Sequence, residues 1–453
     1  MGSITGKVSG EAEPRGEPLR IRHYDVTREP EGVAGLRAHL PRLASTDFAT
    51  RDAVAAIIVD VQERGDAAVA EYSARFDGSQ LTPADWELSL VRCREALDRI
   101  PAALREALEY AADRIRRYHS LQVEHGFEHF DGAGNRLGMR VTPLDAVGLY
   151  VPGGKAAYPS SVLMNAIPAV VAGVTDIIAV TPPGGANDAV LAALAISGVH
   201  RIFLVGGAHA VAALACGTES IPRVDKIVGP GNRWVAEAKR QLFGVVGIDM
   251  IAGPTEVLIL ADETADADRI AADLIAQAEH DEDAGAWVAT TSPTLAGAIA
   301  AALDRALTLA PRADIARAAL ERLGLIVLVP DRAHLAAVAN LRASEHLEIA
   351  TREPAALAGA IRHAGAIFLG HHTPEPVGDY VAGPSHVLPT GGTARYASPL
   401  GVYDFVKRSS VIEYTDAGLR EAAPHIVTLA EAEGLFGHAE AIRRRMEGEW
   451  QGR

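Results

Sequence analysis

Hydrophobic residues recur at three- and four-residue spacings in the first part of the chain. Two stretches with this spacing cover residues 51–78 and 93–122. The spacing is that of a helix with one apolar face. Gly78 is expected to end the first stretch, and Pro101 to begin a helix within the second. Residues 21–149 are therefore predicted to form an N-terminal helical region that leads into the rest of the fold.

From about residue 145 onward, short apolar runs alternate with Ala-rich amphipathic stretches. Asp176–Thr181 and Arg201–Val205 are two of these apolar runs, and the alternation starts again after Gly253. Continuous apolar strands separated by helices are typical of parallel sheets covered on both faces. The fold class is therefore predicted to be α/β, with two Rossmann-like doubly wound units at residues 150–254 and 255–400 and a C-terminal helical segment at 401–453.

Gly- and Pro-rich loops follow several of the predicted strands, at residues 151–161, 205–209, 228–232 and 252–256. In open α/β sheets, ligands bind at the carboxyl ends of the strands, where such loops let backbone amides approach phosphates. None of these loops is GxGxxG, because Trp234 stands where the third glycine would follow Gly229 and Gly231. Motifs alone therefore leave dinucleotide binding open.

Composition narrows the classes of function. The chain has 453 residues, 48% of them hydrophobic, and a formal net charge of −15 without a basic patch, which argues against a nucleic-acid partner. Cys93 and Cys216 are too few for a disulfide framework, so a reduced, cytoplasmic protein is expected. No uninterrupted apolar run is long enough for a membrane span. Residues 1–20 are predicted to be a flexible tail.

The segment QAEHDED contains Gln277 and His280, which are three residues apart. On a helix this spacing brings both side chains to one face, where they can bind one ion. An imidazole nitrogen and an amide oxygen suit a borderline metal such as Zn²⁺. The alternative is a solvated surface helix, so this segment needs further ligands elsewhere in the chain.

Three other polar groups could supply those ligands and a reactive centre. Glu345 and His346 begin a predicted strand, and together they offer two proton-transfer groups that work near neutral pH. Asp379 lies in a Gly- and Pro-rich loop and could be a hard ligand or a turn cap. Glu433 and His438 lie on or beside the last predicted helix, where surface exposure is the alternative.

Long motifs from about residue 25 to 445 closely resemble those of histidinol dehydrogenases. They include VGLYVPGGKAAYPSS, VDKIVGPGN, AGPTEVLILAD, QAEHDE, SEHLEI, GDYVAGPSHVLPT and SPLGVYDFVKRSS, in the order of the family. The resemblance implies a four-electron oxidation of L-histidinol to L-histidine through histidinal, with two molecules of NAD⁺. It also implies two Rossmann-like units in an intertwined homodimer, whose last segment crosses to the partner subunit.

The resemblance assigns roles to individual positions. It implies that one Zn²⁺ is bound by Gln277, His280, Asp379 and a His438 supplied by the partner, that Glu345 and His346 are the catalytic couple, and that NAD contacts Tyr150, His209 and Asn232. The implied substrate-binding residues are Thr255, Gln277, His280, Glu345, His346, Asp379, Glu433 and His438.

Two positions depart from the family pattern. His209 stands where the family has Gln in a loop near the expected cofactor, so NAD affinity or its pH dependence would be affected. Thr255 stands where Ser is common, and it keeps the hydroxyl. The sequence leaves zinc and manganese open as the metal.

Three competing functions remain open at this stage. One is a relative on the same scaffold that oxidises another small polar alcohol. The second is a zinc hydrolase with a metal-bound water, against which the Gly-rich turns weigh, because a hydrolase does not need a dinucleotide site. The third is a non-catalytic binding module, which the presence of every expected chemical residue argues against.

Overall fold

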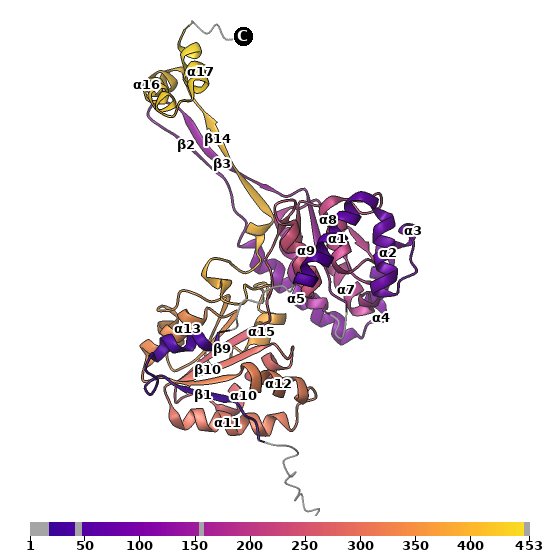
Figure 1. Cartoon of the computed structure of the whole chain (residues 1–453), viewed down its shortest axis with the longest axis vertical. Helices are drawn as coiled ribbons and strands as arrows, with labels where there is room; N and C mark the ends of the chain where they lie inside the picture. The colour runs from indigo at the N-terminus through magenta and orange to yellow at the C-terminus, as the bar shows by residue number, and fades with distance from the viewer. Residues whose placement is uncertain (1–17, 41–47, 154–157, 448–453) are drawn as a thin grey trace, which may run out of the picture.

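The computed structural model describes residues 18–40, 48–153 and 158–447. Two α/β units lie beside each other, and a narrow arm extends away from both of them (Figure 1). Most of the tail predicted for residues 1–20 lies outside the described residues. Within these ranges, no helix is both long enough and apolar enough to cross a membrane.

The first unit is built on a five-stranded parallel sheet with the strand order β6-β5-β4-β7-β8. Its strands are short and mostly buried, as expected for a sheet with helices on both faces. The strands are β4 (Ala146–Tyr150), β5 (Asp176–Val180), β6 (Arg201–Phe203), β7 (Lys226–Val228) and β8 (Gly247–Ile248). The connecting helices are α6 (Pro159–Ala172), α7 (Asp188–Ser197), α8 (Gly207–Cys216) and α9 (Arg233–Leu242), with a 3-10 turn, η2 (Pro183–Gly185).

The strand order of this sheet reverses beside its central strand. β5 and β6 lie on one side of β4, and β7 and β8 lie on the other. Ligands of open α/β sheets bind outside the carboxyl ends of the strands at such a reversal. Tyr150 ends β4 there, and Gly229 follows β7 with a φ of +109°. A Cβ at Gly229 would lie 2.3 Å from the carbonyl oxygen of Tyr150, so this close approach requires glycine.

The N-terminal helices form the outer layers of this first unit. α1 contacts α8 and α9, α4 contacts α7, and α5 contacts α6. Apolar residues of α1, such as Val54 and Ile57, are buried in the same cluster as Val211 of α8. The helices are α1 (Phe48–Arg64), α2 (Asp66–Asp77), α3 (Pro83–Trp86), α4 (Leu90–Arg99) and α5 (Ala102–Ser120). The predicted helical character of this region is therefore present, but the helices share their core with the first sheet.

The second unit repeats the same architecture around a six-stranded parallel sheet in the order β1-β11-β10-β9-β12-β13. Its strands are β1 (Arg22–Asp25), β9 (Glu256–Ala261), β10 (Gly285–Thr290), β11 (Leu325–Leu328), β12 (His346–Ala350) and β13 (Ala366–Leu369). Its helices are α10 (Ala267–Ala278), α11 (Pro293–Leu307), α12 (Ala313–Leu323), α13 (Arg332–Arg342), α14 (Pro354–Ala358) and α15 (Glu375–Tyr380). The parallel α/β fold predicted from the apolar runs is confirmed in both units.

One strand of this sheet comes from the N-terminal region. β1 pairs in parallel with β11 at the sheet edge, although the sequence analysis placed its residues with the N-terminal helices. The strand has only four residues, RHYD, of which Tyr24 alone is buried. So short and polar a strand has no recognisable period, and it is stabilised by pairing with a segment about 300 residues away.

The arm combines a three-stranded antiparallel sheet with two helices. The order of the strands is β14-β3-β2, and Glu413 of β14 pairs with Arg136 of β3 across the ladder. The arm consists of β2 (Phe127–Phe130), β3 (Arg136–Pro143), β14 (Val406–Glu413), α16 (Asp416–Ala432) and α17 (Phe436–Met446). Figure 1 shows α16 and α17 at its far end, away from both units. The helices predicted for the C-terminal segment are present, but the strands were not predicted. β3 and β14 alternate only between exposed and half-buried residues, so they lack the apolar runs of a buried strand.

Three short 3-10 helices complete the described structure. η1 (Gly32–His39) packs against α13, and η3 (Thr393–Arg395) follows the Gly391-Gly392 turn. η4 (Val402–Asp404) lies beside α6 and leads into β14. Lys226 at the start of β7 donates a hydrogen bond to the carbonyl oxygen of Asp404, which ties the base of the arm to the first sheet.

Candidate functional site

Many polar residues lie in a cleft between the two units. A cavity of about 550 Å³ is lined from the first unit by Gly229 and Asn232 and from the second by Thr255, Glu345 and His346, among others. The first unit faces the cleft with the carboxyl ends of its strands. The second unit faces it with the amino ends, because Thr255 immediately precedes β9 and His346 is the first residue of β12.

Glu345 and His346 are held at the junction of β9 and β12. The carboxylate of Glu345 accepts hydrogen bonds from the hydroxyl of Thr255 at 2.6 Å and from the backbone N–H of Glu256 at 2.9 Å. Only 7% of Glu345 and 4% of His346 are exposed. Both side chains are therefore buried at the edge of the cavity, at the start of β12.

His346 is surrounded by carboxylates. Its Nδ1 lies 3.8 Å from Glu345 and 3.8 Å from Glu375, and its Nε2 lies 3.7 Å from Asp379. Burial by itself would lower the pKa of His346, but these carboxylates outweigh burial and raise that pKa to about 10. Burial raises the pKa of Glu345 to about 7 and the pKa of Glu375 to about 8. Three carboxyl groups therefore crowd one imidazole, and burial favours the protonated form of two of them unless a cation lies beside them.

Gln277 and His280 come from the end of α10. Gln277 is fully buried in the last turn, whereas His280 lies just beyond the helix, which ends at Ala278. The N–H of His280 still donates to the carbonyl oxygen of Gln277 at 3.3 Å, so the chain continues as one further turn. The predicted helix therefore carries one of the two residues, and a tight turn carries the other.

Asp379 lies on α15 together with an acid that the sequence analysis missed. Side-chain oxygens of Glu375 and Asp379 and a ring nitrogen of His280 lie within 4.8 Å of one another, an arrangement that can bind a metal ion. Glu375 precedes Asp379 by four residues, and this spacing places both side chains on one helix face. The spacing was visible in the sequence and would have identified Glu375.

The amide of Gln277 lies between the hydroxyl of Thr255 and the carboxyl group of Glu375. One of its terminal atoms lies 3.1 Å from Oγ1 of Thr255, and the other lies 3.0 Å from Oε2 of Glu375. Thr255 has a single hydroxyl proton and donates it to Glu345, so it can only accept from the NH₂ group of Gln277. The amide oxygen then faces the carboxylate of Glu375. Two facing oxygens need a proton or a cation between them, and this fits a metal site.

A buried acid on β12 accepts a hydrogen bond from the start of α15. The carboxylate of Glu348, on the same face of β12 as His346, accepts the backbone N–H of Glu375 at 2.7 Å. Burial and the neighbouring Asp273 raise the pKa of Glu348 well above its usual value, and burial raises the pKa of Asp273 to about 6. The first turn of α15 is thus fixed against β12 and α10.

His386 joins the two units beside this cluster and was also missing from the predicted site residues. Its Nδ1 lies 3.1 Å from the carbonyl oxygen of Asp379, and its Nε2 lies 3.3 Å from the hydroxyl of Ser161 on α6. His386 therefore holds the end of α15 against the first unit.

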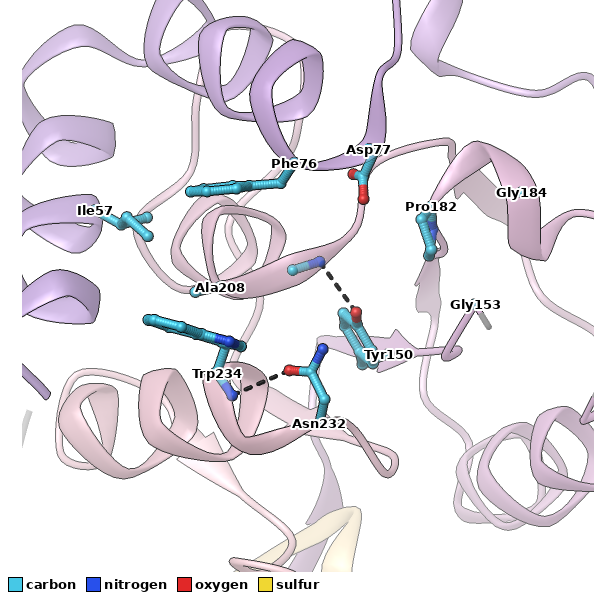
Figure 2. A pocket seen from close by; sticks show the side chains of 11 residues that line it. Ile57, Phe76, Asp77, Tyr150, Gly153, Pro182, Gly184, Ala208, Asn232 and Trp234 are labelled. Atoms are coloured by element: carbon cyan, nitrogen blue, oxygen red, sulfur yellow. Dashed lines mark hydrogen bonds between the residues drawn. The ribbon is translucent and has the colours of Figure 1, made fainter. Parts of the chain in front are cut away.

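A second cavity, of about 580 Å³, opens at the strand-order reversal of the first unit (Figure 2). It shares Gly153 and Asn232 with the cavity in the cleft. Tyr150 lies on its floor and accepts the backbone N–H of Gly207 at 3.0 Å. Asn232 caps α9 by accepting the N–H groups of Trp234 and Val235. Tyr150 and Asn232, two of the three residues predicted to contact NAD, thus line one cavity.

His209, the third residue predicted to contact NAD, points elsewhere. Its side chain is fully buried behind the cavity wall, with Nε2 3.2 Å from the hydroxyl of Ser73 and 3.9 Å from Asp77 on α2. The rings of Tyr72 and Phe76 pack beside it. Burial lowers the pKa of His209 to about 4, so it is neutral near pH 7. Its backbone neighbours Gly207 and Ala208 line the cavity in its place.

Glu433 and His438 do not meet the other predicted site residues within one chain. Glu433 ends α16 and His438 lies in α17, and both are exposed at the far end of the arm (Figure 1).

The fold and this centre define a class of protein, an α/β protein with a polar, acid-rich centre in the cleft between two parallel-sheet units. The chain belongs to the histidinol dehydrogenase family, since the model of that family matches residues 41–446. Histidinol dehydrogenase from Dechloromonas aromatica is 51% identical over 425 residues, which are 93% of this chain and 98% of the relative. The enzyme of that name from Pseudomonas aeruginosa is 52% identical over 436 residues, covering 95% and 98%. A solved histidinol dehydrogenase from Elizabethkingia anophelis has a TM-score of 0.89 at 33% identity, covering 95% and 99%.

Burial of neutral His209 predicts a specific pH dependence of stability. Its folded pKa, about 4, lies below the ordinary value of 6.5, so the unfolded chain binds the extra proton and stability falls as the pH drops through this window. Between pH 7 and pH 5, the free energy of unfolding of wild type should fall by on the order of 2 kcal/mol more than that of His209→Gln. Urea unfolding at both pH values measures this difference. His129→Gln, at an exposed position of β2, is the control and should behave like wild type. Equal losses in wild type and His209→Gln would contradict the assignment.

Proposed function

We propose that this protein oxidises L-histidinol to L-histidine with two molecules of NAD⁺, through histidinal. The observation that carries the proposal is the convergence of six predicted residues in one cleft. Thr255, Gln277, His280, Glu345, His346 and Asp379 come from segments up to 124 residues apart. Relatives at 50–52% identity, all named histidinol dehydrogenases, support this substrate over another alcohol on the same scaffold.

A zinc ion would be bound by Gln277, His280 and Asp379, with the partner's His438 as the fourth ligand. The donors are nitrogen and oxygen only, which suits zinc, and the excess of buried carboxylates around His346 favours a cation at this place. When bound, zinc supplies an anchor for the imidazole and amine of the substrate, so that its main contribution is positioning.

Glu345 and His346 would carry the protons of both oxidation steps. His346 would take the proton of the substrate alcohol in its neutral form, which a metal ion beside the surrounding carboxylates would favour over the imidazolium. Glu345 would then take a proton from the water that adds to the aldehyde. His346, after releasing its first proton to solvent, would take the proton of the resulting hydrate. Thr255, which donates to Glu345, orients that carboxylate and lies close enough to contact the substrate. NAD⁺ supplies the hydride acceptor in both steps.

The cavity beside Tyr150 and Asn232 would bind NAD, because it lies at the strand-order reversal and is continuous in lining residues with the cleft. His209 would act on NAD indirectly, by supporting Ala208 and Gly207 at the cavity wall. We also propose a cytoplasmic location, as expected for a protein whose two cysteines are too few for a disulfide framework.

We further propose a homodimer in which the arm crosses to the partner subunit and supplies its Glu433 and His438. The arm exposes large apolar side chains on both its strands and its helices, a surface that suits a protein partner. They include Phe127, Phe130, Ile412, Leu429 and Phe436. Within one chain, His438 lies far from the other three proposed zinc ligands, and a second copy would bring a His438 to them without a new component.

The reaction and its metal dependence predict a stoichiometry. Purified protein should form about two NADH per histidinol consumed, as two hydride transfers require. Dialysis against a chelator should abolish this activity, and added Zn²⁺ should restore it, because the substrate would lose its anchor. Absorbance at the NADH band with histidine quantification measures both. A ratio near one would mean that the aldehyde escapes, and full activity without metal would refute the zinc site.

The proton-transfer roles predict losses of turnover without loss of metal. Glu345→Gln and His346→Asn should each reduce kcat by about 10²- to 10⁴-fold, the usual contribution of such a group. Metal analysis should still find one zinc per chain in both variants. Glu353→Gln, an exposed acid beyond the other end of β12, serves as the matched control and should retain wild-type kcat. Unchanged turnover in either active-site variant would rule out its assigned role.

The shared site predicts complementation between inactive variants. His280→Ala and His438→Ala homodimers should both be inactive, whereas their mixed dimer contains one site with both histidines intact. Purified mixed dimers with two affinity tags should therefore recover about half of wild-type activity per dimer. No recovery, with both variants folded and dimeric by circular dichroism and light scattering, would show that the arm does not complete the partner's site.

A further inference from the structure

The cavity at the strand-order reversal is closed in part by the N-terminal helices that form the outer layers of the first unit. Ile57 of α1 and Phe76 and Asp77 at the end of α2 line it together with Trp234 of α9. Figure 2 shows the rings of Phe76 and Trp234 facing each other across the space beside Ala208. Phe76 is 53% exposed although it is a large aromatic residue. Two aromatic rings across a gap can stack on a planar base, here the adenine of a dinucleotide.

Asp77 lies next to this aromatic pair, on the side of Tyr150 (Figure 2). Its carboxylate lies near the backbone N–H of Gly206, just before α8, and only 21% of its side chain is exposed. The nearest ring nitrogen is that of His209, 3.9 Å away. Among the described residues that line this cavity, Asp77 is the only charged one.

The position of this acid differs from that in an ordinary dinucleotide site. There, an Asp or Glu near the end of the second strand accepts a hydrogen bond from the 2′-hydroxyl of the adenosine ribose. The second strand here is β5, and it is followed by Thr181-Pro182-Pro183-Gly184, which has no acid. Pro182 and Gly184 line the same cavity as Asp77. A carboxylate from α2 therefore stands where the strand does not supply one.

The negative charge of Asp77 restricts what can lie against it. A carboxylate repels a phosphate group and attracts a hydroxyl donor, so the uncharged ribose is the part of the dinucleotide that suits this place. The pyrophosphate would then lie toward the glycines at positions 153 and 184, where backbone can approach closely.

We propose that Asp77 binds the 2′- and 3′-hydroxyls of the adenosine ribose and thereby selects NAD⁺ over NADP⁺. The added 2′-phosphate of NADP⁺ would meet this carboxylate at short range. The inference rests on the proposed use of NAD⁺, and it names Asp77 as the specificity-determining residue of that site.

The test compares both dinucleotides in one set of variants of the full-length, metal-loaded protein. Isothermal calorimetry gives Kd for NAD⁺ and NADP⁺, and initial rates with histidinol give KM and kcat for each. Asp77→Asn should raise Kd and KM for NAD⁺ about tenfold or more, the usual effect of losing a hydrogen bond to a charged group. The preference for NAD⁺ over NADP⁺ should fall by at least the same factor, and kcat at saturating NAD⁺ should stay within about twofold.

Three further variants make the outcome specific. Glu71→Gln removes one acid from the exposed face of the same helix and should leave the preference unchanged. Phe76→Ala should weaken the binding of NAD⁺ and NADP⁺ by a similar factor, because stacking on adenine does not depend on the 2′-phosphate. Asp77→Glu keeps the charge and should retain most of the preference, which provides a test if Asp77→Asn does not fold.

The outcomes separate this inference from the proposed function. An unchanged preference in folded Asp77→Asn, or its loss in Glu71→Gln, would overturn the role of Asp77 while wild-type turnover with NAD⁺ stands. If wild type neither binds nor uses NAD⁺, the proposed function itself fails.

Discussion

The site depends on a buried carboxylate that connects two neighbouring strands. Glu345 accepts hydrogen bonds from Thr255 and from the backbone of Glu256, and these bonds hold the starts of β9 and β12 together. Because Thr255 donates its hydroxyl proton to Glu345, it can only accept from the amide of Gln277, whose oxygen is then turned toward Glu375. The orientation of the amide and the placement of His346 both follow from this interaction. Burying a carboxylate costs free energy unless hydrogen bonds compensate, and both donors to Glu345 come from the start of β9.

Two features of the sequence allowed much of the fold to be predicted. Short continuous apolar runs that alternate with Ala-rich helical stretches indicate buried parallel strands. Both predicted α/β units are present. β1 and the ribbon of β2, β3 and β14 were not predicted, because their residues are polar or half-exposed and their pairing joins segments far apart in the sequence. Local sequence patterns cannot specify which distant strands will pair, because the paired segments meet only in the complete fold.

The candidate site was predictable only as far as its motifs extend. Gln277, Asp379 and the pair Glu345 and His346 lie together as expected, although their roles stay proposals. Glu375 was missed despite its helical spacing from Asp379, because a glutamate after proline in a loop resembles a turn. The direction of His209 could not have been foreseen, since it depends on Ser73 and Asp77 of a helix 130 residues earlier in the chain.

The two units face the cleft with opposite ends of their sheets. The carboxyl ends of the strands in the second unit therefore point away from the cleft. At the carboxyl ends of β9 and β12, Asp262 and Thr351 line a separate hollow on the side of the second unit opposite Glu345 and His346. Loops at that edge can change in length or sequence without disturbing the centre. Insertions and tags should therefore be tolerated better there than anywhere along the cleft, which makes this edge the natural place for variation and for engineering.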